Sequence, residues 1–538
     1  MRELNELLLC DLVQARADRD PDLDVLCFEH FSLDGGATDD EVRTYADLQV
    51  NANRVASGFV ARGLERGDRV ALMMRNHPEF VETMIAASIT GALFVPIDPR
   101  TRGEKLAFML ADTGCSGIVC ADYCVAEIGS VAAELPDLKW ALVLGGLDPA
   151  RDGAFERVDS LEELLTRPAD SVRPRVDSPD APLQIMYTSG TTGDPKGIVG
   201  NNFRFCAASM LAAMFGYRSD ERPYTGLSLT HGNAQAITLA PALGVGLRAV
   251  FSRRFTKSKL WELCRRYGCT SFALVGGMVT GIYGEPQRED DADNPVRMVV
   301  SGGMPAAIWE AFERRFAVKV LEFYGAMDGG GMAYKPVGEG PVGSFGKAMP
   351  GIEMRILDEE GRECPAGVVG EICTRPSDGQ SAAVDYYGKP DASKRKIRGG
   401  WNRSGDMGHA DEDGWLFFDY RVGGGIRHNG DFINPGYVEK IIAEHPGVSD
   451  VCVYGVPAAS GVPGEKDVVA AIVPSQGRSF SADSVFLSCR EKLEPNSLPA
   501  YLQVLDEIPK TASEKPQERL LLERFDPEAK EVFANPDL

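Results

Sequence analysis

Strand-like and helix-like segments alternate through much of the first three hundred residues of the chain. The segment Arg69–Met73 has the apolar run of a buried strand, Pro78–Gly91 has a helical pattern, and Ala92–Ile97 reads as the next strand. The same rhythm returns at three later strand-like segments: 249–251, 271–275 and 298–300. Because parallel strands must be joined by crossover connections, this alternation predicts mostly parallel sheets covered by helices.

The pattern changes after residue 343. Between Gly343 and Trp415, turns rich in Asp, Glu and Gly separate short alternating strands, which indicates an antiparallel sheet or a small barrel. Three consecutive glycines follow at 423–425, and a smaller unit with strands near 451–455 and 468–473 comes after them. We therefore expect a large N-terminal part and a small α+β C-terminal part.

Charge and apolar content limit the classes of function. The chain has 538 residues, of which 57 are basic and 79 acidic, for a formal net charge of -22. Phosphate backbones require basic surface, so nucleic acid binding is disfavoured and an enzyme acting on small molecules is favoured. The longest apolar stretch, Met84–Ile97, is too short to span a bilayer. The twelve cysteines include no C-x-x-C pair, which predicts buried free thiols and a cytoplasmic protein.

A polar loop follows the apolar run Leu183–Met186. The loop, Tyr187–Gly197, holds four Ser or Thr hydroxyls, three glycines and one lysine within eleven residues. Such a loop directs N–H groups, hydroxyls and an ammonium group at one small volume, which is what a polyphosphate requires. Its spacing differs from the Walker form, since no Gly-Lys-Ser/Thr triplet follows.

Further motifs follow in the sequence: Ser301–Pro305, Glu322–Asp328, Trp401–Asp406, Arg421, Gly430–Pro435 and Pro509–Lys515. Together with the loop they resemble the adenylate-forming superfamily, which includes acyl-CoA synthetases, firefly luciferases and peptide-synthetase adenylation domains. The resemblance covers about residues 40–515. It implies an α/β fold with two mostly parallel, helix-covered sheets and a small β-barrel-like subdomain in residues 1–421. A hinge at 422–425 and a mobile α+β domain at 426–538 would complete the chain.

The resemblance also implies roles for individual residues. The β- and γ-phosphates of ATP would be held by Thr188, Ser189, Gly190, Thr191, Thr192, Gly193 and Lys196. Adenine and the α-phosphate would lie against Gly302, Gly303, Met304, Tyr324, Gly325 and Met327. Asp328 would bind Mg²⁺, because a carboxylate is a hard oxygen ligand, and Asp406 with Arg421 would hold the ribose.

The remaining roles concern the acid and coenzyme A. Lys515 would reach the α-phosphate and the attacking carboxylate, where a point cation suits the charge that develops. His231 would form a wall of the acyl pocket or take part in acid–base chemistry, and the loop at Gly430 would line the pantetheine channel. The basic run Lys394–Lys396 is more typical of a solvated helix face than of a contact to CoA phosphates.

Several positions depart from the family pattern. Met327 replaces a threonine and has no side-chain donor, Asp328 replaces a glutamate, and Glu514 replaces a glycine. At the hinge, Gly423 stands where the family often has Asp or Lys. Glycine keeps rotation feasible but removes side-chain control of it.

The resemblance predicts a two-step acid–thiol ligase that uses ATP, Mg²⁺ and coenzyme A. A carboxylic acid would be activated as acyl-AMP with release of pyrophosphate, and its acyl group would then pass to coenzyme A. Within the superfamily, residues 231–235 and 424–431 are most similar to carnitine/crotonobetaine-CoA ligase-like acyl-CoA synthetases. Three alternatives stay open: an enzyme that loads a separate carrier protein, a luciferase-type oxidative enzyme, and a degenerate nucleotide-binding homologue. Neither the acid nor the oligomeric state follows from the sequence.

Overall fold

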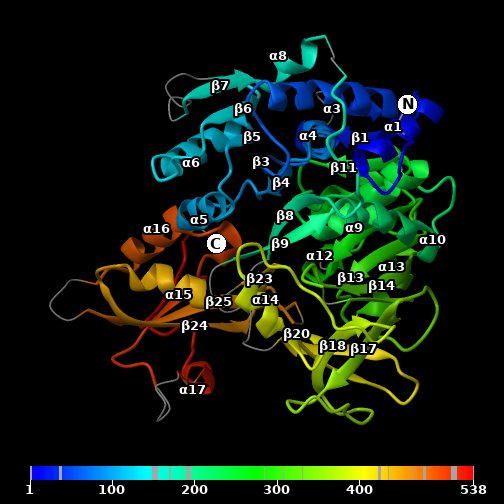
Figure 1. The fold of residues 1–538 in the computed structure, drawn as a ribbon. Coiled ribbons are helices and arrows are strands. Elements are labelled where there is room, and N and C mark those ends of the chain that lie inside the picture. The colour runs from blue at the N-terminus through cyan, green and yellow to red at the C-terminus, as the bar shows by residue number, and fades with distance from the viewer. Residues whose placement is uncertain are drawn as a thin grey trace.

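The structure is a computed structural model of the chain. It describes residues 3–34, 39–147, 155–168, 171–188, 195–283, 285–306, 308–329, 331–421, 426–429, 431–433, 435–462, 464–475, 480–509, 516, 518–536 and 538. Figure 1 shows two large sheets in the N-terminal part and a smaller unit near the C-terminus.

The first sheet is almost entirely parallel, and only its last strand, β9, is antiparallel to its neighbour. Successive side chains of β3 alternate between two cores: Val70 and Leu72 pack against α3 and α4, whereas Ala71 and Met73 pack against α5 and α6. Both faces are therefore covered by helices, as predicted. The strand order is β7 (Arg157–Ser160), β6 (Trp140–Leu144), β5 (Gly117–Ala121), β3 (Arg69–Met73), β4 (Leu93–Pro96), β8 (Pro182–Thr188) and β9 (Lys196–Asn201).

The second sheet has a parallel half and an antiparallel half. The parallel half consists of β1 (Asp24–Glu29), β11 (Ala249–Ser252), β10 (Pro223–Thr225), β12 (Ser271–Val275), β13 (Met298–Gly302) and β14 (Lys319–Gly325), with β2 (Glu41–Thr44) antiparallel at its edge. The antiparallel half continues through β15 (Met332–Lys335), β16 (Ser344–Ala348), β21 (Leu416–Arg421), β20 (Trp401–Ala410), β18 (Gly370–Pro376) and β17 (Ile352–Leu357), and β19 (Ile397–Arg398) pairs with β20. The predicted barrel-like subdomain is thus an extension of this sheet.

Helix α4 (Pro78–Thr90) links the two sheets. It starts with proline in its first turn and ends before Gly91, whose φ of 72° suits a residue without a Cβ. All of its residues are buried, and the largest core cluster joins it to strands of both sheets. The helices around the sheets are α1 (Leu9–Arg19), α2 (Phe31–Asp34), α3 (Tyr45–Val60), α5 (Gly103–Thr113), α6 (Asp122–Ala132), α8 (Leu161–Thr166), α9 (Asn202–Ala207), α10 (Leu211–Met214), α11 (Leu260–Tyr267), α12 (Gly276–Tyr283), α13 (Trp309–Phe316) and α14 (Pro390–Lys396). Short 3-10 helices occur at η1 (Ala208–Met210) and η4 (Lys257–Lys259), and π-helices at η2 (Ala234–Leu239) and η3 (Ala242–Gly246).

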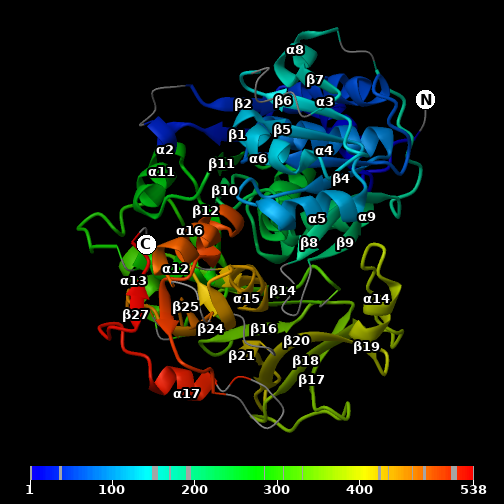
Figure 2. The ribbon, with the colours of Figure 1, turned by 90° about the vertical axis from the view of Figure 1, so that its left-hand side faces the viewer.

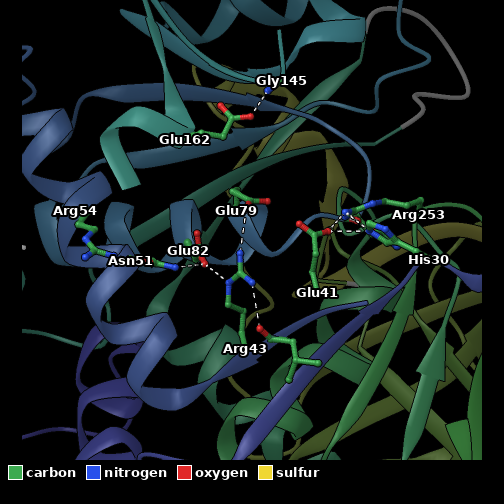
Figure 3. Close-up of polar contacts among 12 residues, drawn as sticks. His30, Glu41, Arg43, Asn51, Arg54, Glu79, Glu82, Gly145, Glu162 and Arg253 are labelled. Carbon is green, nitrogen blue, oxygen red and sulfur yellow. Dashed lines mark hydrogen bonds and ion pairs between the residues drawn. The ribbon is translucent and has the colours of Figure 1, made fainter. Parts of the chain in front are cut away.

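A buried charge cluster fastens α4 to β2 (Figure 3). Arg43 contacts Glu82 at 2.8 Å and Glu79 at 3.2 Å, and Asn51 donates a hydrogen bond to Glu82 at 2.8 Å. Two buried carboxylates share one arginine. Burial and the charge of Glu82 raise the pKa of Glu79 to about 7. This cluster lies outside the cleft described below, so we assign it a structural role.

The C-terminal unit has a four-stranded sheet and a hairpin. The sheet runs β24 (Val448–Pro457), β25 (Lys466–Pro474), β26 (Tyr501–Val504) and β27 (Val532–Ala534), and α15 (Pro435–Ala443) and α16 (Ala482–Lys492) share a core with it. The hairpin pairs β22 (Ile426–His428) with β23 (Asp431–Ile433), and η5 (Pro495–Ser497) and α17 (Glu518–Glu523) complete the unit. Figures 1 and 2 both show α16 beside α5 of the N-terminal part. Among the described residues, no helix has the length and apolar content needed to cross a membrane.

Candidate active site

A large cleft, of about 2360 Å³, opens at the carboxyl ends of strands from both sheets. Val275, Gly302 and Gly325 line it where β12, β13 and β14 end. Asp98, which follows β4 of the first sheet, lines it as well. This edge of parallel sheets is where α/β folds bind ligands, because loops and strand ends converge there. Residues of the C-terminal unit, including Asp431 and Asn496, close part of the rim.

The two ends of the polar loop Tyr187–Gly197 lie on β8 and β9. Thr188 ends β8 and pairs in register with Lys196, which begins β9. The Lys196 ammonium group lies 5.4 Å from the centre of the Tyr386 ring and faces the cleft. The side chain of Thr188 and all of Ser189, Gly190, Thr191, Thr192 and Gly193 lie outside the described residues.

Asp328 lies on the same wall of the cleft as Lys196. Its Oδ2 accepts a hydrogen bond from the Tyr386 hydroxyl at 3.0 Å and lies 2.7 Å from the ammonium nitrogen of Lys396. Asn402 donates a hydrogen bond at 2.9 Å to the backbone carbonyl of Asp328, which fixes the turn. The described residues contain no group of three or more His, Cys, Asp or Glu side chains able to hold a metal. A single carboxylate still fits Mg²⁺, since this ion keeps waters and takes further oxygens from substrate phosphates.

Positive charge gathers around Asp328. The pKa of Lys196 is lowered, first by burial and then by the charges of Lys396, Arg395 and Lys389, while Asp328 opposes the shift. Arg395 and Lys396 lie on α14 and also line the cleft. This wall is locally basic in a chain whose net charge is -22.

Tyr324, on β14, and Asp406, on β20, contact each other within the second sheet. The Tyr324 hydroxyl donates a hydrogen bond to Asp406 at 2.7 Å, and its ring stacks on Phe345 with centroids 4.7 Å apart. The backbone N–H of Asp406 is held by the Ser404 hydroxyl at 2.9 Å. An aromatic face beside a carboxylate suits a nucleoside, because the ring covers a base and the carboxylate accepts from ribose hydroxyls.

The glycine segment next to Tyr324 is held by Glu322. The backbone N–H groups of Gly303 and Met304 donate to its carboxylate, and the bond from Met304 is 3.1 Å long. Burial raises the pKa of Glu322 to about 8. Gly302 and Gly303 line the cleft, whereas the Met304 side chain is buried in the core. The segment is therefore set beside Tyr324 by hydrogen bonds that the sequence motif did not indicate.

His231 lines the cleft, and its neighbour Gly232 lies against Met327. Its ring is open to the cleft, although the surrounding protein lowers its pKa, chiefly by burial. The N–H of Asn233 donates to Nδ1 at 3.3 Å, which favours the neutral ring with the proton on Nε2. A Cβ added at Gly232 would overlap the sulfur of Met327. The Met327 side chain therefore packs against the His231 loop.

Several predicted site residues are not described in full. Gly430 and Lys515 lie outside the described residues, as do Gly423 and Glu514. The backbone of Arg421 pairs with that of Asp406 between β21 and β20, so the proposed ribose residues come from neighbouring strands. Their roles remain predictions.

Two cleft residues have no role in the sequence predictions. Tyr386 lies outside the predicted motifs, and an isolated Tyr carries no distinctive pattern. Glu322 begins the motif Glu322–Asp328, but the motif does not indicate its hydrogen bonds to Gly303 and Met304. The basic run on α14 was noticed and was interpreted as a solvated face. That interpretation is wrong for Lys396, whose side chain lines the cleft and pairs with Asp328, and it holds for the exposed Lys394.

Comparison with known proteins identifies the family of the chain. The family model described as AMP-binding enzyme matches residues 13–387, and the model described as AMP-binding enzyme C-terminal domain matches residues 437–515. The chain therefore belongs to the AMP-binding enzyme family. The predicted relationship to adenylate-forming enzymes of the acyl-CoA synthetase group is confirmed at this level.

Individual relatives are more distant. A crotonobetaine/carnitine–CoA ligase of Salmonella paratyphi A is 28% identical over 484 residues, which cover 88% of this chain and 91% of that protein. The o-succinylbenzoate CoA synthetase of Bacillus subtilis, as a double mutant bound to a product analogue, has a TM-score of 0.79 at 23% identity over 96% of this chain and 98% of that one. The same enzyme in complex with AMP has a TM-score of 0.64 at 22% identity over 97% and 98%. These structures share the fold of the chain described here.

Proposed function

We propose that the chain is an AMP-forming acid–CoA ligase. In the first step a carboxylate of the substrate acid attacks the α-phosphate of ATP, giving acyl-AMP and pyrophosphate. In the second step the thiol of coenzyme A attacks the acyl carbon and AMP leaves. The observation that carries the proposal is the nucleoside site of Tyr324 and Asp406 in the same cleft as Lys196 and Asp328.

The residues along this cleft would bind and orient ATP. Tyr324 covers the adenine and Asp406 accepts from the ribose, while Lys196 and the loop before it hold the outer phosphates. Asp328 would hold Mg²⁺ together with phosphate oxygens, and the ion would offset the charge of the polyphosphate. Phosphoryl chemistry of this kind depends on positioning and electrostatics rather than on a protein nucleophile.

The acid would lie between His231 and the apolar wall formed by α9, η1 and α10. Met210, Met214 and Leu211 line this part of the cleft, and 67% of the Met210 surface is exposed. We propose that His231, as a neutral ring, contacts the carboxylate end of the substrate. The particular acid is left open.

The two steps would use two arrangements of the C-terminal domain, which we place at 426–538 after a hinge at 422–425. Lys515 would serve adenylation and the Gly430 loop would serve thioester formation. Two structures of the o-succinylbenzoate CoA synthetase of Bacillus subtilis can be compared with this chain. The TM-score is higher for the complex with the product analogue than for the complex with AMP, which supports the view that the present arrangement belongs to the second step. Asp431, beside Gly430, lines the cleft in this arrangement.

A cytoplasmic location is part of the proposal. All twelve cysteines are free, and eleven of them are buried, which fits a reducing compartment. No nucleic acid partner is proposed, because the acidic surface opposes one.

Pyrophosphate release across a panel of carboxylic acids, with and without coenzyme A, tests the function. We expect acid-dependent pyrophosphate and AMP, and a thioester detected by mass spectrometry when coenzyme A is present. Acyl transfer to a carrier protein but not to coenzyme A would support the carrier-loading alternative. Absence of pyrophosphate with every acid would support a degenerate nucleotide-binding homologue.

A further inference from the structure

We propose that Lys396 positions the polyphosphate of ATP: its ammonium group, paired with Asp328 in the structure, binds phosphate oxygens when nucleotide enters the cleft. The inference deepens the proposed function and rests on it. It adds a cation from α14 to the phosphate site that we propose beside Lys196.

The geometry places Lys396 beside the proposed metal ligand. Its ammonium nitrogen lies 2.7 Å from Oδ2 of Asp328 and donates to the backbone carbonyl of Ser404 at 3.1 Å. The two charged side chains are only 17% and 12% exposed, so the pair is largely removed from water. If Asp328 held Mg²⁺, it would attract this ammonium group less strongly. The ammonium group would then be available to phosphate oxygens of the nucleotide.

The balance of charge supports the same reading. Among the described residues, the cations Lys196, Arg395 and Lys396 line this wall of the cleft with the carboxylate Asp328, and the pKa of Lys196 is lowered partly by its cationic neighbours. The ammonium nitrogen of Lys389 lies 3.7 Å from Oδ1 of Asp112. Lys389 therefore has its own carboxylate partner and is not needed to neutralise the charge of Asp328. A cluster with more cations than anions in a chain of net charge -22 is balanced when a polyanion binds.

Tyr386 holds these groups together. Its hydroxyl donates to Asp328 at 3.0 Å, its ring lies under Lys196, and its side chain packs in one cluster with Ile198, Ala392 and Met327. Met327 presents a thioether on this wall and no hydrogen-bond donor. Lys396 is therefore a charged donor from α14 on a wall where Met327, the residue before Asp328, offers none.

The helix supplies its own control. Lys394 lies two residues before Lys396 on α14, but its side chain is exposed and does not line the cleft. Both substitutions Lys396→Met and Lys394→Met remove one positive charge from the same helix. A difference in ATP affinity between the two variants would therefore reflect where the charge lies and not how many charges the helix carries.

The test is ATP binding to the full chain by isothermal titration calorimetry, with and without Mg²⁺, alongside pyrophosphate release. We expect Lys396→Met to weaken ATP binding roughly tenfold or more, because a charge-assisted contact is lost. Lys394→Met should stay within about twofold of wild type, since an exposed charge contributes little. Lys396→Arg should recover most of the affinity.

Other outcomes would decide against the proposal. Wild-type affinity in Lys396→Met, or an equal loss in Lys394→Met, would overturn it. If Lys396→Met does not fold, Lys396→Gln keeps a hydrogen bond to Asp328 without the charge and must show the same loss. ATP binding without pyrophosphate release from any acid would overturn the proposed function alone, whereas a wild-type chain that binds no ATP would overturn both.

Discussion

Single residues of the site depend on partners that are far away in sequence. Tyr324 and Asp406 are 82 positions apart and share a hydrogen bond, and Asp328 is bonded to Tyr386, 58 positions away. Each of these proposed binding groups is thus oriented by a second side chain that its own sequence motif does not contain. We expect this orientation to favour affinity, because a carboxylate held in one position needs no reordering when a nucleotide binds.

The first prediction concerns Tyr324→Phe. This change keeps the stacked ring and removes the hydroxyl that holds Asp406, so ATP binding should weaken by about 1 kcal/mol, or about fivefold. Isothermal titration calorimetry measures the change. Tyr123→Phe, which alters a tyrosine outside the cleft, serves as the control. Unchanged ATP affinity in Tyr324→Phe would show that this hydrogen bond does not contribute to nucleotide binding.

The second prediction concerns Glu322 and pH. Its pKa is raised to about 8 in the folded chain, against an ordinary value near 4.5, because the carboxyl is buried. The folded state therefore binds this proton more tightly than the unfolded state does. The contribution of this proton to the free energy of unfolding is complete below about pH 4.5 and is lost as the pH rises to about 8. The substitution Glu322→Gln removes this titration. The difference in thermal midpoint, variant minus wild type, should therefore increase as the pH rises.

Differential scanning calorimetry of both proteins between pH 5 and pH 8.5 gives that comparison. Only the difference between variant and wild type is interpreted, since other groups such as Glu79 titrate in the same range. Parallel midpoints across this range would mean that Glu322 has an ordinary pKa in the folded chain.

At the scale of elements, strand β16 positions the residues of the proposed nucleoside site. It carries Phe345, on which Tyr324 stacks, and it runs close to β15 through Gly346, whose φ is 104°. A methyl group at Gly346 would overlap the backbone carbonyl of Tyr334. The close approach of two strands, made possible by one glycine, therefore determines where the ring of Tyr324 lies.

The third prediction follows from that approach. Gly346→Ala should destabilise the chain by about 3 kcal/mol, through positive φ and a backbone clash together, and should weaken ATP binding by displacing Phe345. Gly338→Ala is the matched control. Gly338 also has a positive φ, of 75°, but nothing lies within 4 Å of an added Cβ. We expect a loss of about 1–2 kcal/mol there and normal ATP binding.

Thermal midpoints and calorimetric ATP titrations of the two variants provide the measurement. Equal destabilisation of both would show that the backbone angle alone, and not the contact with Tyr334, limits residue 346.

For the whole molecule, the contacts between its two parts matter most. Lys105 at α5 binds Glu494 at 2.7 Å, and Arg100 lies 3.8 Å from Asp431 while forming a two-pronged pair with Asp98. Figures 1 and 2 show α16 of the C-terminal unit beside α5. These ion pairs stabilise the arrangement that we assign to thioester formation.

The fourth prediction tests that assignment. Glu494→Lys places two cations together, which disfavours this arrangement by about 1 kcal/mol, so thioester formation from supplied acyl-adenylate should slow about fivefold. Pyrophosphate release should stay unchanged because it uses the other arrangement. The double variant Lys105→Glu/Glu494→Lys should recover the rate. Rapid-quench assays of the two half-reactions measure both effects, and equal slowing of both would contradict the assignment.

Local patterns predicted much of the fold. The strands Arg69–Met73 and Ser271–Val275 and the start of the helix at Pro78 agree with the structure, because a run of apolar residues and a proline act over a few neighbouring residues. The order of strands within the sheets was not predictable in this way. The antiparallel strands from β16 to β17 join the second sheet through pairings between distant segments.

The sequence by itself determined the alternating α/β pattern, the polar loop Tyr187–Gly197 and the motifs typical of an adenylate-forming enzyme, since each depends on residues that are adjacent in the chain. Only the tertiary structure decided that Lys396 faces Asp328 while Lys394 faces solvent, and that Tyr324 is held by Asp406. The physical reason is that a side chain's partner depends on how distant strands and helices pack. One turn of α14 can place two identical residues in different surroundings.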